Sequence, residues 1–296
     1  MLEVKGVVPP LITPLDENEK LDEGGLRRLI NYVMKGGVHG IFVIGSTGEF
    51  YGLSFEDKKK IVEIAMEEVN GRIPVYVGAS AITTRDCIRL AEMAKSYEAA
   101  AITVLTPMFI TPNEKELYDH FAAIAKAVDI PNVIYNNPER TGVNMSAGLV
   151  EQLADIDNIV AAKDTSGDMT LTSEYIRRTK DKNFSIMAGR DTMILATLAY
   201  GGTGCVAGTA NVVPKLVVEI YDKFIAGDMQ GALDAQFRLS LFRNAYSMGS
   251  FPVVPKDALN ILGVNVGHPI RPIQHMTEEN QEKLRKILVQ IGVIKD

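Results

Sequence analysis

The sequence has little cysteine and lacks any segment suited to enter or cross a membrane. Cys87 and Cys205 are the only cysteines and lie in segments of unrelated pattern, which excludes a disulfide framework. No apolar run approaches the roughly 18 residues that span a bilayer. The first ten residues, MLEVKGVVPP, carry Glu3 and two prolines where a signal peptide needs an apolar core. We therefore expect a cytoplasmic protein with free, buried thiols.

An excess of positive charge and a cluster of histidines are also missing. The net charge is -6 and no basic cluster stands out, which excludes nucleic acid and anionic membranes as main partners. The four histidines are scattered, and none lies at ligand spacing from another His, Cys or carboxylate; they are His39, His120, His268 and His275. None ends a strand-like run, so we expect neither a metal site nor a Ser-His-Asp arrangement.

The sequence does have a regular alternation of short apolar runs and longer amphipathic segments. Hydrophobic residues make up 46% of the 296 residues, which is enough for a sizeable core. Most of the apolar runs lack polar alternation, as strands that are buried on both faces do. We predict eight strands, within residues 6–14, 40–45, 74–80, 100–107, 131–138, 159–165, 184–190 and 204–211.

The segments between these runs carry helical spacing and helix-start signals. Residues 26–33 place their apolar side chains on one face, and Ser54 with Asp57 comes close to a capping box. Repeated strand–helix units predict an α/β fold, a closed (β/α)8 barrel, over residues 1–226. A doubly wound open sheet is the alternative, but its Gly-rich first turn is missing. Residues 227–296 lack such strands and are expected to form a C-terminal helical region that packs on the barrel.

Lys163 is the unusual residue among the predicted strands. It ends the apolar run of NIVAAKDTSG, whereas the other predicted strands carry no lysine in their later halves. Active sites of such barrels lie where the strands end. Burial there disfavours the charged amine and lowers its pKa, and a neutral amine can attack a ketone. A salt bridge to Asp164, or an amine that reaches solvent, is the alternative explanation.

Other strand ends supply hydroxyl groups. Tyr135 ends the neighbouring strand, where its phenol could carry protons for Lys163; a core tyrosine is the alternative. Ser46 and Thr47, between two glycines, could bind a carboxylate through hydroxyls and backbone N–H groups, although such residues are also common in turns. The glycines of 201–204 could approach a phosphate, as in a phosphate-binding isomerase, but a helix-to-strand turn explains them equally well.

Three of these segments resemble one family. GSTGE, YNNPERTG and AAKDTSGD are similar to motifs of the dihydrodipicolinate synthase / N-acetylneuraminate lyase family. The resemblance implies a homotetrameric barrel in which Lys163 forms a Schiff base with pyruvate and Tyr135 carries protons. It also implies that Thr47, with Ser46, holds the pyruvate carboxylate, that Val206 offers its backbone carbonyl near the lysine, and that no metal or dissociable cofactor is needed.

The second substrate is less clearly indicated by the resemblance. Arg140 matches the arginine with which the synthases hold the carboxylate of aspartate semialdehyde, which favours this condensation. Three residues, Thr165, Gly189 and Asp191, resemble lyase positions that contact sugar hydroxyls, so a retro-aldolase of a 2-keto-3-deoxy acid or of N-acetylneuraminate is the alternative. Met108 and Phe109 replace a relay tyrosine of the synthases. The alternative function from a class other than enzymes is that of a non-catalytic relative that binds a keto acid.

Overall fold

The computed structural model describes residues 2–295. Eight strands alternate with helices along the chain, as the sequence predicts. By its internal contacts the chain divides into a first unit, Met1–Gly6 with Pro74–Val206, and a second unit, Val7–Ile73 with Ala207–Asp296. The division at residue 226 between a barrel and a C-terminal helical region remains a prediction.

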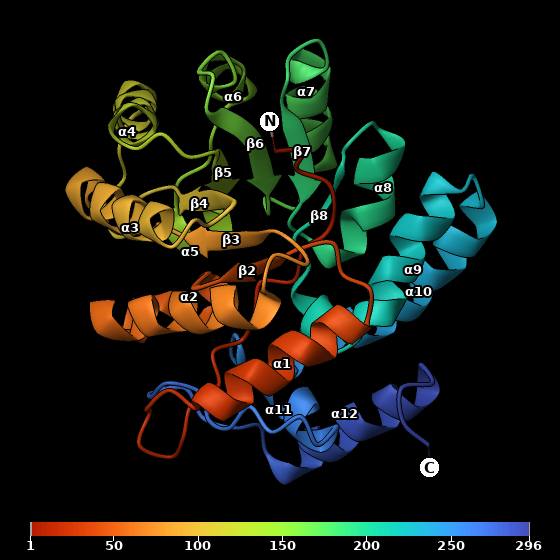
Figure 1. The fold of residues 1–296 in the computed structure, drawn as a ribbon. Coiled ribbons are helices and arrows are strands. Elements are labelled where there is room, and N and C mark those ends of the chain that lie inside the picture. Colours follow the sequence, from red (N-terminus) through yellow and green to blue (C-terminus); the bar gives the residue numbers. More distant parts are fainter. Residues whose placement is uncertain (1, 296) are drawn as a thin grey trace. The chain divides into compact units, whose positions relative to one another are not determined.

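The first unit is built on six consecutive parallel strands. They are β3 (Val75–Gly78), β4 (Ala101–Leu105), β5 (Asn132–Asn136), β6 (Ile159–Asp164), β7 (Ser185–Ala188) and β8 (Gly204–Cys205), and each pairs with the next. Its helices are α3 (Thr84–Ser96), α4 (Glu114–Ala127), α5 (Pro138–Thr141), α6 (Ala147–Leu153), α7 (Met169–Thr179) and α8 (Ile194–Ala199), with a short 3-10 turn, η3 (Asp191–Met193). Figure 1 shows α3, α4, α6 and α7 on one side of these strands. Because the strands are parallel, their carboxyl ends lie at one edge.

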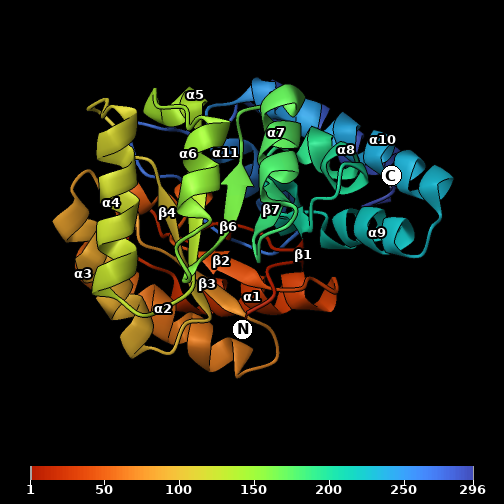
Figure 2. The same ribbon diagram turned by 90° about the horizontal axis from the view of Figure 1, so that it is seen from above.

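The strands of the first unit are buried on both faces. All six residues of β6 and all five of β5 are buried, which explains apolar runs without polar alternation. In Figure 2, α6 and α7 lie beside β6 and β7. The Tyr175 side chain of α7 is fully buried and its hydroxyl donates to the Met145 carbonyl at 2.6 Å. Lys163 of β6 therefore belongs to a core that is otherwise largely apolar.

The second unit contains strand β2 and the C-terminal helices, whereas the two-residue strand β1 (Gly6–Val7) has one residue in each unit. Its elements are α1 (Glu23–Lys35), β2 (Ile41–Val43), the 3-10 turns η1 (Ser46–Gly48) and η2 (Phe50–Gly52), α2 (Phe55–Val69), η4 (Gly208–Asn211), α9 (Pro214–Ile225), α10 (Met229–Asn244), η5 (Ala245–Met248), α11 (Val253–Ile261) and α12 (Glu278–Gln290). The predicted capping box is present, since Ser54 accepts from the Asp57 N–H and Asp57 from the Ser54 N–H. None of the helices within residues 2–295 combines the length and apolar character that a membrane span requires.

The first and last strands are shorter than predicted. Strand β1 is only Gly6–Val7, because Pro9 and Pro10 have no N–H to donate to a ladder. Strand β8 is only Gly204–Cys205, and the chain then enters the turn η4, where Asn211 donates to the Gly208 carbonyl at 3.0 Å. Side-chain hydrogen bonds of this kind compete with strand pairing, and apolar composition alone does not indicate them.

Both cysteines are free and buried, as predicted. Burial raises the pKa of the Cys87 thiol to about 11. Burial and the negative charge of Asp191 raise the pKa of Cys205 well above its usual value. Since the thiolate is the reactive form, these cysteines are structural residues with little nucleophilic character.

His120 of α4 is a buried imidazole with one satisfied nitrogen. It is 6% exposed, and its Nδ1 lies 2.9 Å from the Thr84 hydroxyl. Its Nε2 is buried and has no hydrogen-bond partner among the described residues. Burial lowers the pKa of His120 to about 4, so the ring is neutral at neutral pH.

We predict that acid destabilises the protein through His120. The folded-state pKa of about 4 lies below the usual 6.5, so the unfolded chain binds the proton first as pH falls. The free energy of unfolding should drop between about pH 6.5 and 4, by up to about 3 kcal/mol. Denaturant unfolding across this range should show that His120→Leu loses this part of the pH dependence. Parallel pH profiles of the two proteins would contradict the prediction.

Candidate active site

Lys163 lies near the carboxyl end of β6 and is almost completely buried. Its side chain is 4% exposed, and its register partners are Tyr135 on β5 and Met187 on β7. The Lys163 Nζ lies 3.8 Å from the centroid of the Tyr135 ring. This distance is well within the range of a cation–π contact, and burial strengthens such contacts. The structure therefore brings together the amine and the phenol that the sequence singles out.

Electrostatics favour the ionised form of the Tyr135 phenol. Burial by itself raises the pKa of Tyr135, but the positive charge of Lys163 and hydrogen bonds to the hydroxyl lower it more, so the net pKa lies below its usual value. One of these bonds comes from the Asn137 amide, whose nitrogen donates to the Tyr135 oxygen at 2.8 Å. A phenol with a lowered pKa releases its proton more readily, as a proton carrier must.

Asp164 forms its own network at the end of β6. Its carboxylate accepts hydrogen bonds from the Thr172 hydroxyl at 2.6 Å, the Ser166 hydroxyl at 2.9 Å and the Asn136 amide at 3.1 Å. Successive residues of a strand point to opposite faces of the sheet. Asp164 thus ties the strand end to α7 and β5, which makes the alternative of a simple Lys163–Asp164 salt bridge a poor explanation of the lysine.

Thr165 and Gly189 fit against one another beyond β6 and β7. A Cβ on Gly189 would lie 2.0 Å from the Thr165 hydroxyl oxygen and 2.8 Å from the Asp164 carbonyl oxygen. Only glycine leaves room for this close approach. The Thr165 hydroxyl is buried, and its interaction with the Tyr135 hydroxyl helps to lower the pKa of Tyr135. Thr165 therefore belongs to the polar side chains that surround the Tyr135 hydroxyl at the strand ends.

Charged side chains line the loops after β5 and β7. Arg140 of α5 is about half exposed and lies 3.8 Å from the Glu139 carboxylate. The same carboxylate binds Arg190, which follows β7, at 2.9 Å. Sequence reasoning singled out Arg140 but missed Arg190, although an arginine directly after a strand-end glycine was the available signal. Two guanidinium groups thus lie beside one carboxylate in these loops.

The other residues singled out in the first unit also follow strand ends. Asp191 is buried in η3 after β7. Val206 follows β8, and its N–H donates to the Ala188 carbonyl at 2.8 Å, which continues the ladder. Phe109, after β4, is 93% exposed, and Met108 is half-buried. Neither of the last two side chains can transfer a proton, as the sequence indicates.

Ser46 and Thr47 belong to the second unit, where they form the turn η1 directly after β2. Thr47 is buried and Ser46 is half-buried. A Cβ on Gly48 would lie 2.8 Å from the Leu11 carbonyl oxygen, and the Thr13 hydroxyl donates to the Gly48 carbonyl at 2.7 Å. Ile44 and Glu49, on either side, have positive φ angles of 51° and 56°. Such conformations are unfavourable for these side chains and cluster at functional sites.

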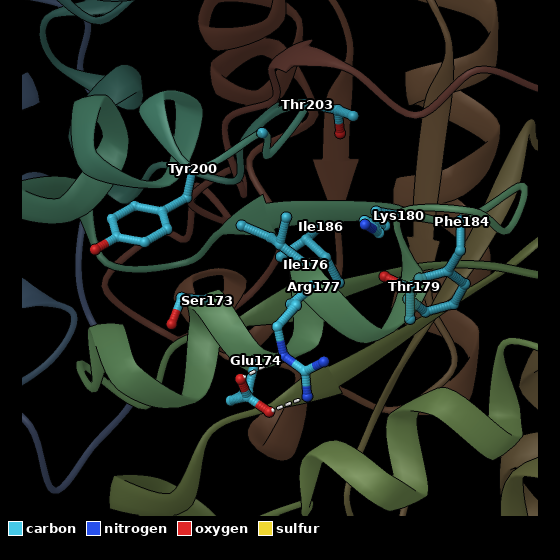
Figure 3. A pocket seen from close by; sticks show the side chains of 11 residues that line it. Ser173, Glu174, Ile176, Arg177, Thr179, Lys180, Phe184, Ile186, Tyr200 and Thr203 are labelled. Atoms are coloured by element: carbon cyan, nitrogen blue, oxygen red, sulfur yellow. Dashed lines mark hydrogen bonds and ion pairs between the residues drawn. The ribbon is translucent and has the colours of Figure 1, made fainter.

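A cavity of about 600 Å³ lies elsewhere in the first unit. Figure 3 shows its lining, with Ile176 and Ile186 toward the middle and the ion pair of Glu174 and Arg177 on α7. Gly201 and Thr203, from the segment considered for phosphate, also line it. A Cβ on Gly204 would lie 2.1 Å from the Gly6 carbonyl oxygen, so packing explains that glycine.

Within residues 2–295, no group of three or more His, Cys, Asp or Glu could hold a metal ion.

Comparisons with known proteins show which family this chain resembles. The model of the dihydrodipicolinate synthetase family matches residues 3–291. A 4-hydroxy-tetrahydrodipicolinate synthase of Methanothrix thermoacetophila is 39% identical, over 97% of each chain. The solved dihydrodipicolinate synthase of Aquifex aeolicus is 32% identical with a TM-score of 0.94, over 99% of this chain and 100% of its own. A prophage protein of this family from E. coli K12, solved in complex with pyruvate, is 29% identical with a TM-score of 0.95, again over 99% and 100%.

These likenesses extend over almost the whole chain, including its C-terminal helices. They confirm the predicted fold class, a (β/α)8 barrel with a C-terminal helical extension. They also agree with the motifs at the strand ends, where GSTGE, YNNPERTG and AAKDTSGD stand in the predicted order. On both grounds, the chain belongs to the dihydrodipicolinate synthetase family.

Proposed function

We propose that this chain is a lyase that condenses pyruvate with aspartate semialdehyde through a Schiff base on Lys163, as a 4-hydroxy-tetrahydrodipicolinate synthase. The observation that carries the proposal is the burial of the Lys163 amine against the Tyr135 ring at the carboxyl ends of parallel strands. The synthase relative at 39% identity and the pyruvate complex of the E. coli relative support it.

The chemistry begins with attack of the Lys163 amine on the ketone carbon of pyruvate. The carbinolamine loses water and becomes a protonated imine, which withdraws electrons from the adjacent methyl group. Loss of a methyl proton gives an enamine, whose carbon adds to the aldehyde of the second substrate. The amino group of aspartate semialdehyde can then attack the imine carbon, close a ring and release Lys163. The protonated imine on Lys163 acts here as the electron sink, so the steps require no metal.

Three groups of residues are assigned roles in the reaction of this amine. Tyr135 carries protons to and from the carbinolamine and the enamine, a role that its lowered pKa supports. Thr47 and Ser46 hold the pyruvate carboxylate through hydroxyl and backbone donors and assist the proton transfer. The backbone carbonyl of Val206 accepts a hydrogen bond from the amine or carbinolamine. These roles depend on matched positions in the family and on the strand-end placement of each residue.

Arg140 is assigned to the carboxylate of the aldehyde. A guanidinium can bind a carboxylate with two parallel hydrogen bonds, and the adjacent Arg190 adds positive charge. A second candidate function, cleavage of a 2-keto-3-deoxy sugar acid, is favoured by the buried Thr165 hydroxyl, which interacts with the Tyr135 hydroxyl. In that case Thr165, Gly189 and Asp191 would contact the sugar hydroxyls. The charge of the preferred aldehyde distinguishes the two.

The resemblance extends the proposal to assembly and location. We expect a homotetramer with small-molecule substrates as its only other partners. A cytoplasmic location fits the two free, buried thiols, since a reducing compartment keeps such cysteines unpaired.

Borohydride reduction in the presence of pyruvate should attach the ligand covalently to Lys163. The reagent reduces the imine to a stable amine, which peptide mass spectrometry locates. Lys163→Ala should lose the adduct completely while it keeps the circular dichroism of the folded protein. Lys180→Ala changes an exposed lysine and should keep the adduct. An adduct that persists in Lys163→Ala would show that the nucleophile is another residue.

Tyr135→Phe should slow turnover far more than it weakens pyruvate binding. Removal of a proton carrier costs about 100-fold or more in kcat, whereas the ring that contacts Lys163 is retained. Steady-state kinetics should therefore show a large fall in kcat and a small change in the KM for pyruvate. Tyr175→Phe, which removes a buried structural hydroxyl, should affect stability instead of kcat. Equal losses in kcat and pyruvate binding would argue against a carrier role.

Arg140→Ala should selectively weaken the use of a carboxylated aldehyde. The KM for aspartate semialdehyde should rise about tenfold or more, because a charge-assisted pair is lost. The KM for an uncharged aldehyde such as butyraldehyde should stay the same. Arg177→Ala removes an exposed arginine with a comparable ion pair on α7 and serves as the control. Indifference to the charge of the aldehyde would favour the sugar-acid lyase.

A further inference from the structure

The second unit contains a pair of opposite charges that is completely buried. Glu49 and Lys256 are each 0% exposed, and the Lys256 Nζ lies 2.5 Å from the Glu49 Oε2. Glu49 is the last residue of the GSTGE motif, whereas Lys256 lies in α11 more than two hundred positions later. The pair therefore joins the turn after β2 to the C-terminal helices within this unit.

Both members of the pair make additional hydrogen bonds. The other oxygen of Glu49, Oε1, accepts from the Ile270 N–H at 2.7 Å. The Lys256 amine also donates to the His268 carbonyl. Burial lowers the pKa of Lys256, while the charge of Glu49 opposes this effect. Each charge is thus held by a partner of opposite sign and by the backbone of the segment around residues 268–270.

That segment is itself anchored. Asp257, next to Lys256 in α11, binds the His275 Nδ1 through one carboxylate oxygen and accepts from the Met276 N–H at 2.8 Å through the other. The His275 Nε2 in turn lies 2.9 Å from the His268 Nδ1. The backbone groups that hydrogen-bond to Lys256 and Glu49 therefore belong to a loop that α11 holds in position.

The pair acts on the conformation of the Ser46–Gly48 turn. Glu49 follows the turn directly, and its backbone has a φ of 56° while its N–H donates to the Ser46 carbonyl at 3.1 Å. A non-glycine residue keeps this conformation only when its surroundings enforce it. Gly48 also accepts a hydrogen bond from the Thr13 hydroxyl, and its N–H donates to the Gly45 carbonyl at 3.0 Å. The buried side chain of Glu49 adds an anchor from the C-terminal side of the turn.

We propose that the Glu49–Lys256 pair is a positioning device that holds the Ser46–Thr47 turn in the shape that receives the pyruvate carboxylate. Stability alone does not explain such a pair, because apolar side chains of similar volume usually stabilise a buried site equally well or better. Two charges fix direction and distance at once, which apolar contacts do not. The inference depends on the proposed function, since it presupposes that this turn binds pyruvate.

The test replaces the pair by apolar side chains and measures each substrate separately. Because it leaves no unpaired charge, the double variant Glu49→Leu/Lys256→Met should remain folded. We expect its KM for pyruvate to rise about tenfold or more, as misplaced donors bind a carboxylate poorly. The KM for aspartate semialdehyde and the yield of the Lys163 adduct at saturating pyruvate should match the unmodified protein. Glu49→Asp, which keeps the charge, should recover part of the loss.

Controls separate a positioning role from a structural one. Lys115→Met/Asp119→Leu removes an exposed pair on α4 and should leave all these quantities unchanged. An unchanged KM for pyruvate in the buried double variant, or equal increases for both substrates, would overturn the inference. If that variant does not fold, Glu49→Gln decides by the same criterion, with the pyruvate-induced shift in melting temperature as a second measurement.

Failure of the inference and failure of the proposed function give different results. If the unmodified protein forms no borohydride adduct with pyruvate, the proposed function fails and the positioning role fails with it. If the unmodified protein forms the adduct at Lys163 while the double variant keeps its affinity for pyruvate, only the positioning role is wrong.

Discussion

The register between β5 and β6 is the constraint on which the proposed chemistry depends. Parallel pairing sets Tyr135 opposite Lys163, and the shared burial of the two strands keeps the amine against the aromatic ring. A shift of β6 by one residue against β5 would turn Lys163 to the face of the sheet opposite to Tyr135. The same ladder continues past the strands through the Thr165 N–H and the Asn136 carbonyl, so the loops that carry the neighbouring polar groups start from fixed points.

The polar groups around this ladder are arranged in two ways. Asp164 and Asn136 satisfy one another and the adjoining loops, so they maintain the strand ends. The Thr165 hydroxyl and the Asn137 amide, by contrast, interact with the Tyr135 hydroxyl, and Arg140 and Arg190 both lie beside Glu139. Hydroxyl, amide and guanidinium groups at strand ends suit a site for an anionic, oxygen-rich ligand. In the second unit, Glu49 is likewise held by Lys256 and the Ile270 N–H, and it follows directly after the turn that carries the hydroxyls of Ser46 and Thr47.

Sequence reasoning was sufficient wherever a local rule decides the structure. The strand at Lys163 was predicted because an uninterrupted apolar run needs cover on both faces, and helix α2 begins at Ser54 because a capping box satisfies its first N–H groups. The limit of β1 follows from a local rule that was overlooked, since Pro9 and Pro10 have no N–H to donate. The position of Asn211 after β8 depends in addition on a distant residue, because its amide also donates to the Pro10 carbonyl. For the same reason Lys256 gave no signal, because its partner Glu49 is remote in sequence, and Arg190 became notable only through Glu139.

The chemical state of the two cysteines has a practical consequence. Thiol reagents and peroxides react with thiolates, and the high pKa values of Cys87 and Cys205 leave almost none at physiological pH. The protein should thus tolerate maleimides and mild oxidants without protective reductants. Methionine thioethers need no deprotonation to be oxidised, so the half-buried Met108, in the loop after β4, is a more accessible sulfur than either thiol.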